Sequence, residues 1–145
     1  MLMKSQAPFA LLARLLLAGV FIVEGWGKVV QYSGTVQYME QYGVPGALLP
    51  VVILTELGGG LLVAFGLLTR IAAFALSGFC LLAALLFHGA LSDPNELIQF
   101  YKDIAIAGGF LGLVAFGAGE WSLDAWLARP RTRTMSPAST RELRE

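Results

Sequence analysis

Four long apolar stretches occupy most of this chain, and each is long enough to cross a lipid bilayer. They run roughly over residues 9–30, 47–68, 71–91 and 97–119. A hydrocarbon core of about 30 Å needs about 20 residues of helix at about 1.5 Å per residue. The pattern therefore predicts an all-α fold, a bundle of four transmembrane helices.

Composition supports a membrane protein independently of the pattern. Hydrophobic residues make up 57% of the chain, charged residues only 14%, and the mean hydropathy is +0.70. A soluble domain carries about 25% charged residues, and a chain this short could not bury so much apolar surface in one core. We expect one membrane domain at 1–128. The remaining stretch, 129–145, is rich in Thr, Ser, Pro and Arg and is predicted to be a disordered tail.

The distribution of basic residues predicts the topology. Four spans place Lys28 and Lys102 on one side of the membrane, each at a helix end. The other side receives Lys4, Arg14, Arg70, Arg129, Arg131 and Arg133. Basic residues collect on the cytoplasmic side, so both termini are predicted to be cytoplasmic. In a bacterium this places the chain in the inner membrane, with the loops at 31–46 and 92–96 facing the periplasm.

Both outer loops carry local signals. Residues 35–42 read as a short helix that stops at Gly43, and Tyr32, Tyr38 and Tyr42 suit an aromatic belt at the headgroup level. This segment could be an interfacial anchor or a lid over an entrance from the outer leaflet. In the second loop, Asp93 is predicted to cap the fourth helix, with Glu96 closing a capping box.

Several spans contain ionisable residues near their outer ends or middle. A charge at membrane depth costs about 2.5 kcal/mol or more, so such residues usually face protein or water. We expect them to form one connected polar region in the outer half of the bundle, and two interpretations stay open. The region could fix helix register through ion pairs, or it could be a ligand pocket or proton relay. Its members are Glu24, Lys28, Glu56, His88 and Lys102.

Two further sets of residues are predicted to be structural. Small residues allow close helix approach in lipid, which predicts helix contacts at Gly59, Gly60, Gly108, Gly109 and Gly112. At the cytoplasmic end, charged residues near helix ends are predicted to form a structural latch: Arg14, Arg70, Glu120 and Asp124.

Several chemistries have no support in the sequence. Cys80 is the only cysteine and His88 the only histidine, so no dithiol, iron–sulfur or bis-histidine haem motif is present. No spacing suggests a metal site, and no glycine-rich loop follows a strand. We therefore predict no metal, no intrinsic cofactor and no nucleic-acid partner. Catalytic residues cannot be assigned.

Taken together, these residues resemble the DoxX family of small four-helix membrane proteins over about residues 8–127. The resemblance rests on the order and spacing of Arg14, Gly25-x-x-Lys28, Gly43-x-Pro45, Glu56-x-x-Gly59-Gly60, Gly66-x-x-Thr69-Arg70, His88, Lys102, Gly108-Gly109 and Gly117-x-Gly119-x-x-Ser122-x-Asp124. The family is similar to the DoxD subunit of archaeal thiosulfate:quinone oxidoreductase. The resemblance implies a membrane partner in redox or sulfur metabolism, with quinone as the candidate ligand.

Three functions follow as hypotheses. The first is a membrane subunit or accessory protein of a redox complex, in which Lys28, His88 and Lys102 donate hydrogen bonds to a quinone and Glu24 or Glu56 relays protons. The second is a small transporter or proton-permeation element. The third is a structural or assembly subunit of a larger membrane complex. All three place the chain in a lipid bilayer, with protein partners or further copies of itself.

Overall fold

A computed structural model describes residues 2–129, with side chains from Gln6 onward. The predicted tail, apart from its first residue, lies outside the described residues. Every described element is helical, which confirms the all-α prediction. Four of the described segments are long and apolar enough to cross a membrane: Gln6–Val30, Gly46–Phe65, Thr69–Phe87 and Pro94–Phe116.

Three of the spans are single helices: α1 (Leu2–Val30), α5 (Thr69–Phe87) and α6 (Pro94–Phe116). The second span is built from four pieces: the 3₁₀ turn η1 (Gly46–Leu48), α3 (Leu49–Ile53), the π-helical turn η2 (Leu54–Gly58) and α4 (Gly59–Phe65). Two short helices flank the bundle, α2 (Tyr32–Gln41) in the first loop and α7 (Leu123–Leu127) after α6. The outer-loop helix was predicted, whereas the breaks in the second span were not.

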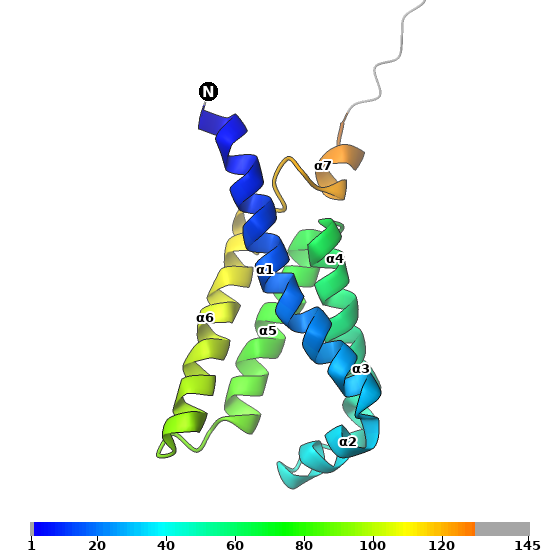
Figure 1. The fold of residues 1–145 in the computed structure, drawn as a ribbon, viewed down its shortest axis with the longest axis vertical. Helices are drawn as coiled ribbons and strands as arrows, with labels where there is room; N and C mark the ends of the chain where they lie inside the picture. The colour runs from blue at the N-terminus through cyan, green and yellow to red at the C-terminus, as the bar shows by residue number, and fades with distance from the viewer. Residues whose placement is uncertain (1, 130–145) are drawn as a thin grey trace, which may run out of the picture.

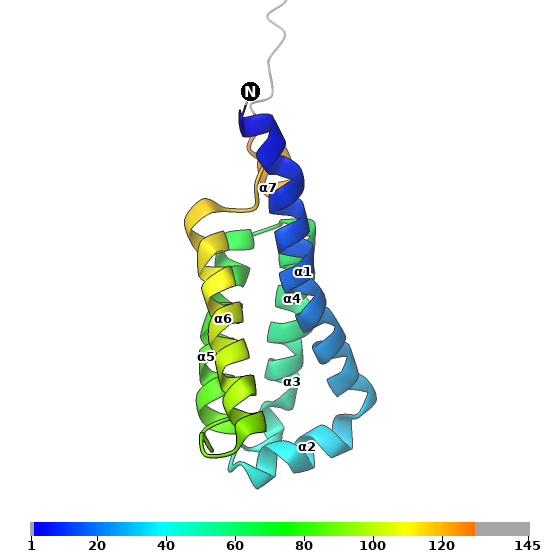
Figure 2. The same cartoon turned by 60° about the vertical axis from the view of Figure 1, so that its left-hand side comes forward.

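The bundle consists of two helix pairs. α1 packs against the second span and α5 packs against α6, and the pairs separate toward the end where α2 crosses (Figures 1 and 2). Both ends of the described chain lie at the opposite end of the bundle (Figure 1). The core joining the pairs is apolar and includes Ala18, Phe21, Val63, Leu76, Phe110 and Leu113.

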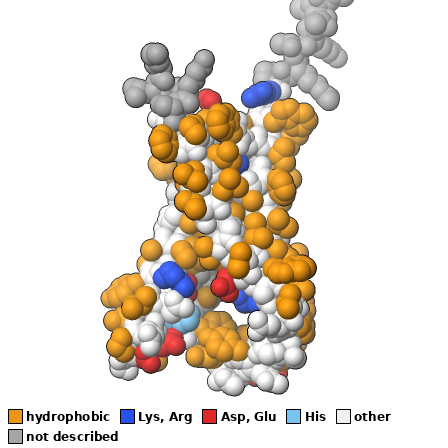
Figure 3. Space-filling view, viewed as in Figure 1, with side chains coloured by type: hydrophobic (Ala, Val, Ile, Leu, Met, Phe, Trp, Pro, Cys, Tyr) orange, Lys and Arg blue, Asp and Glu red, His pale blue; other side chains and the backbone are white. Residues whose placement is uncertain are grey.

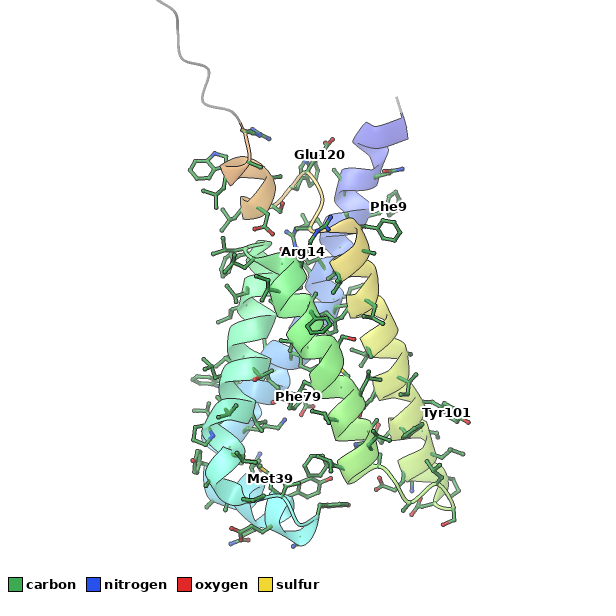
Figure 4. The ribbon with its side chains drawn as sticks, turned by 180° about the vertical axis from the view of Figure 1, so that it is seen from behind. Phe9, Arg14, Met39, Phe79, Tyr101 and Glu120 are labelled. Carbon is green, nitrogen blue, oxygen red and sulfur yellow. The ribbon has the colours of Figure 1, made fainter. Side chains whose placement is uncertain are left out.

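Arg14 stabilises the end of the bundle at which both ends of the described chain lie. Its side chain is 2% exposed, and it donates hydrogen bonds to the backbone oxygens of Ala118 (2.7 Å) and Trp121 (2.9 Å). The predicted latch placed Glu120 and Asp124 beside Arg14. The prediction was wrong for Glu120, whose side chain is exposed at the same end of the bundle (Figure 4). Arg70 is exposed as well. Arg14 binds carbonyls because the chain turns at Gly117 and Gly119, both at φ 80°, which leaves backbone oxygens without helical partners.

Asp124 joins α7 to the turn between α4 and α5. α4 ends at Gly66, whose φ of 68° is left-handed, and the Asp124 backbone N–H donates to the Gly66 oxygen at 2.8 Å. The carboxylate in turn accepts from the backbone N–H groups of Leu68 (2.8 Å) and Thr69 (3.0 Å) at the start of α5. Partial burial opposes the charged form, yet these hydrogen bonds and the Arg14 charge lower the pKa of Asp124 below its ordinary value.

The predicted glycine contacts divide into two groups. A Cβ at Gly59 would lie 3.2 Å from Leu76, one at Gly60 would lie 3.3 Å from the Ala18 oxygen, and one at Gly109 would lie 3.1 Å from Leu17. These three glycines lie at helix contacts. By contrast, Gly108 and Gly112 have open space around them, so their predicted contact was wrong within this chain.

The error at Gly108 and Gly112 has a simple geometric cause. The predicted contacts at Gly109 and Gly112, together with Lys102 in the polar region, would require the α6 face that carries these three residues to point inward. In the structure α6 instead buries Ala107, Phe110 and Leu113, a face rotated by about one residue, or about 100°. The large apolar residues, rather than the small ones, fill the space between the two helix pairs.

Candidate functional site

A cavity of about 850 Å³ lies between the two helix pairs, at the end where α2 crosses. Figure 3 shows acidic, basic and histidine side chains around this hollow. The rest of its lining is largely apolar and aromatic, and Figure 4 shows Phe79 and Met39 on the hollow's side of α5 and α2. The five residues predicted to form a polar region all line the cavity: Glu24, Lys28, Glu56, His88 and Lys102.

One wall carries an ion pair between α1 and the second span. The Lys28 Nζ lies 2.9 Å from Glu56 Oε2 and donates a hydrogen bond to Oε1 at 3.1 Å. Glu24, one turn earlier on α1, lies 3.5 Å from the same ammonium group. The exposed fraction of the side chains rises from 5% at Glu56 through 23% at Lys28 to 63% at Glu24. The three groups thus lead from a buried carboxylate to an accessible one.

Glu56 retains unused hydrogen-bonding capacity. Its Oε2 atom is buried and lies 2.9 Å from the Lys28 Nζ, which is its ionic partner, although the angle of approach is not that of a hydrogen bond. A carboxylate oxygen has two lone pairs, so this atom can accept a hydrogen bond in addition to its contact with the ammonium group. The atom is therefore available to a ligand or water in the cavity.

The backbone around Glu56 explains how this pair forms. Glu56 lies in η2, and π-helical turns in α-helices are frequent at functional sites. The adjacent α1 carries Gly25, where a Cβ would stand 2.8 Å from the Leu57 backbone nitrogen. The glycine thus permits the two helices to touch at their backbones. Lys28, three residues further along α1, then reaches across to Glu56.

The opposite wall carries a histidine between two carboxylates. His88 Nδ1 lies 2.6 Å from Glu96 Oε2, and Nε2 lies 3.9 Å from Asp103 Oδ2. Glu96 was predicted to close a capping box with Asp93, and this was wrong because its carboxylate pairs with His88. Asp93 itself caps α6 as predicted, accepting from the Asn95 backbone N–H at 2.8 Å.

Lys102 and Asp103 complete this wall. Lys102 Nζ donates to Gln99 Oε1 at 2.7 Å, and both residues line the cavity. Asp103 was not predicted, although an acidic residue inside the fourth apolar stretch was itself the signal. Among the described residues, the polar groups therefore form separate clusters on facing walls rather than one continuous set of contacts.

Aromatic residues close the cavity at the α2 end. Tyr38 of α2 stacks on Phe87 of α5 with ring centroids 5.6 Å apart, and Tyr42 meets Phe87 edge-on at 5.3 Å. At the other end the apolar core closes it, because Ala18, Leu76 and Phe110 are fully buried between the cavity and Arg14. The cavity is thus a chamber confined to one half of the bundle and open on the face between α6 and α2 (Figure 3).

This chamber suits a flat polar group with acceptors on opposite sides. Lys28 offers a donor on one wall, while His88 and Lys102 offer donors on the other. The carboxylates beside them can hold or pass protons. No group of three or more His, Cys, Asp or Glu side chains in the described part of the chain is arranged to hold a metal ion.

Comparisons with known proteins agree with this architecture. The DoxX family model matches residues 9–89, more than half of the chain. Inner membrane protein YqjF of Escherichia coli (strain K12) is 50% identical over 124 residues, covering 86% of this chain and 95% of YqjF. Inner membrane protein YphA of the same organism is 35% identical over 122 residues, covering 79% of this chain and 86% of YphA.

A more limited match is with a protein of Bacillus subtilis. CatD of Bacillus subtilis (strain 168), whose name describes it as a candidate oxidoreductase, is 40% identical over 68 residues, which is 47% of this chain and 51% of CatD. No solved structure matches the chain. The family match and the extent of the two E. coli alignments show that this chain is a membrane protein of the DoxX family.

Proposed function

We propose that this DoxX protein is a membrane subunit or accessory protein of a redox complex, and that its cavity binds the head group of a quinone. One observation carries the proposal. The cavity places hydrogen-bond donors on both walls, together with the buried Glu56 carboxylate, which is paired with Lys28 at 2.9 Å and can accept from a hydroxyl group of the reduced ring. The partial similarity to CatD gives independent support for a redox role.

The chemistry of a quinone matches these groups. Its two carbonyl oxygens accept hydrogen bonds, and its reduction to a hydroquinone takes up electrons and protons. Lys28 would hold one carbonyl, and His88 or Lys102 the other. Protons would reach the ring through Glu24 and Glu56, whose carboxylates flank the Lys28 ammonium group at 3.5 Å and 2.9 Å. The electrons would come from a redox partner protein in the complex.

The two alternative functions fit the geometry less well. A permeation element needs a polar path through the bundle, whereas fully buried apolar side chains lie between the cavity and Arg14. A purely structural subunit has no need for charged side chains on two facing walls of an open cavity, because charges at membrane depth are costly. The ion pair can still stabilise the bundle while it serves the ligand.

The proposal is tested by purifying the full-length protein from bacterial membranes in a mild detergent. Mass spectrometry would then identify bound lipids, quinones and copurifying proteins. We expect a quinone and a redox protein with the wild-type chain, and loss of the quinone from Glu56→Gln. Glu120→Gln, which removes an exposed carboxylate at the other end of the bundle, is the matched control. Equal quinone content in the wild type and Glu56→Gln, or none in either, would contradict the proposal.

A further inference from the structure

A second, smaller hollow runs along the outside of the bundle between the second span and α5. It has a volume of about 390 Å³ and is lined almost entirely by apolar groups, among them Val52, Phe74, Gly78, Phe79 and Leu82. Thr55 contributes the only hydroxyl group, which already donates to the Val51 backbone oxygen at 2.9 Å. Phe74 and Leu82 are left uncovered by the protein, so this groove faces the surrounding lipid.

The groove adjoins the polar cavity. Val52, Phe79 and Leu82 line both hollows, as does Val51. Figure 4 shows Phe79 on the side of α5 that faces the second span. From there the groove extends along α5 to Phe74, more than one helical turn toward the start of that helix.

The other sides of the cavity are unsuitable for an apolar chain. Toward α2 the cavity is covered by the contacts of Tyr38 and Tyr42 with Phe87. On the face between α6 and α2, charged side chains surround the opening (Figure 3). An apolar chain that left there would have to displace water and counter-charges from these groups. The groove beside Phe79 offers an apolar route instead.

We propose that the apolar tail of the bound quinone leaves the cavity past Phe79 and lies in this groove. The inference rests on the proposed function, since it assigns the second part of the same ligand. The head and the tail of such a molecule need environments of opposite polarity. The cavity supplies the polar one and the groove the apolar one. Because lipid tails are as apolar as the groove, the groove acts by giving the tail room rather than by a hydrophobic driving force.

Gly78 provides a specific test of the groove. A Cβ at this position would meet no atom within 4 Å, so a larger side chain would occupy the groove without disturbing helix packing. Gly108 on α6 has the same open surroundings and lies outside both hollows, which makes Gly108→Leu the matched control. Ala75→Leu, which also fills the groove, is the second variant.

The experiment uses the full-length protein in lipid nanodiscs and two probes. One probe is a dimethoxy-methyl-benzoquinone without a tail, and the other is the same ring with a decyl chain. We expect Gly78→Leu and Ala75→Leu to weaken binding of the tailed probe by about tenfold, the effect of one overpacked contact. Binding of the tailless probe should stay unchanged in both variants. Gly108→Leu should bind both probes as the wild type does.

The outcomes separate this inference from the proposed function. If the wild type binds both probes but Gly78→Leu and Ala75→Leu bind the tailed probe normally, the tail route is wrong and the head-group site stands. An equal loss of both probes would also contradict the tail route. If the wild type binds neither probe, the proposed function fails and the tail route fails with it.

Discussion

Lys28 and Glu56 come from different spans, yet the Lys28 Nζ lies 2.9 Å from Glu56 Oε2 at the wall of the cavity. The lysine lies in the last turn of α1, and the glutamate lies in the π-helical turn of the second span. Only 5% of the Glu56 side chain is exposed, so the ion pair is the main source of charge compensation at that depth. The same pair therefore joins two helices and places a charged group from each at the cavity wall.

Replacement of Lys28 alone should lower the stability of the protein more than replacement of both Lys28 and Glu56. Lys28→Met leaves Glu56 as a buried charge without a partner, and we expect the free energy of unfolding to fall by about 3 kcal/mol. The double variant Lys28→Met/Glu56→Gln should regain part of that loss. Glu24→Gln should cost less than about 0.5 kcal/mol, because its side chain is 63% exposed. Thermal unfolding in detergent measures the stability of the wild type and of these three variants. A double variant less stable than Lys28→Met would contradict this explanation.

Two glycines should respond in opposite ways to alanine. At Gly25 a Cβ would stand 2.8 Å from the Leu57 backbone nitrogen, and backbone atoms cannot move aside cheaply. Gly25→Ala should therefore lower the free energy of unfolding by about 1–3 kcal/mol. Gly108 has open space, so Gly108→Ala should be neutral or stabilise the helix by up to about 1 kcal/mol. The thermal midpoints of the two variants and the wild type test this. A Gly25→Ala protein as stable as the wild type would show that the backbones of α1 and the second span are not in contact at Gly25.

Asp124 should make stability sensitive to acid. Its pKa is lower in the folded state than its ordinary value of 3.8. Its contribution is thus fully present above about pH 4 and is lost as the pH falls through the folded-state pKa. Asp124→Asn should cost about 1 kcal/mol at pH 7, as the loss of a helix cap does, and should weaken the acid dependence. Thermal midpoints between about pH 3 and pH 7 test this. The same acid dependence in Asp124→Asn as in Glu120→Gln would disprove the assignment.

The orientation in the membrane is a separate prediction. Both ends of the described chain lie at one end of the bundle (Figure 1), and the basic residues near the spans favour that end as the cytoplasmic one. Single cysteines introduced at Gln41 and Glu120, in a background lacking Cys80, would report it through a membrane-impermeant thiol reagent. We expect labelling from the periplasm at position 41 only. Labelling at position 120 alone would show that the protein has the opposite topology.

The sequence predicted the four spans because apolar length is a local property. Their boundaries shifted by a few residues where capping decides the end, as at His88, which lies just beyond α5 rather than inside it. The divided second span could not be read from the pattern. A π-helical turn adds a residue without changing composition, and its presence depends on how Glu56 and its neighbours pack against α1.

At the site, the residue types were predictable and their grouping was not. Charged residues in apolar stretches indicated the cavity lining, because lipid excludes charge. Which partner each would find depended on the rotation of α6. A shift of one residue turned Asp103 inward and left Gly108 and Gly112 outward, a difference that apolar content alone does not encode. Phe87 was missed as well, since its contacts with Tyr38 and Tyr42 join distant segments.

The central claim, that the cavity holds a quinone ring, is tested most directly by photolabelling in native membranes. The probe is a benzoquinone that carries an azide on its ring, and the labelled residues are mapped by peptide mass spectrometry. We predict labels in two segments: residues 20–31, at the end of α1, and residues 79–88, at the end of α5. Excess unlabelled benzoquinone should prevent them, Glu56→Gln should reduce them and Glu120→Gln should leave them unchanged. Labels confined to lipid-facing residues such as Phe9 and Phe116, or labels that excess benzoquinone does not reduce, would contradict the account.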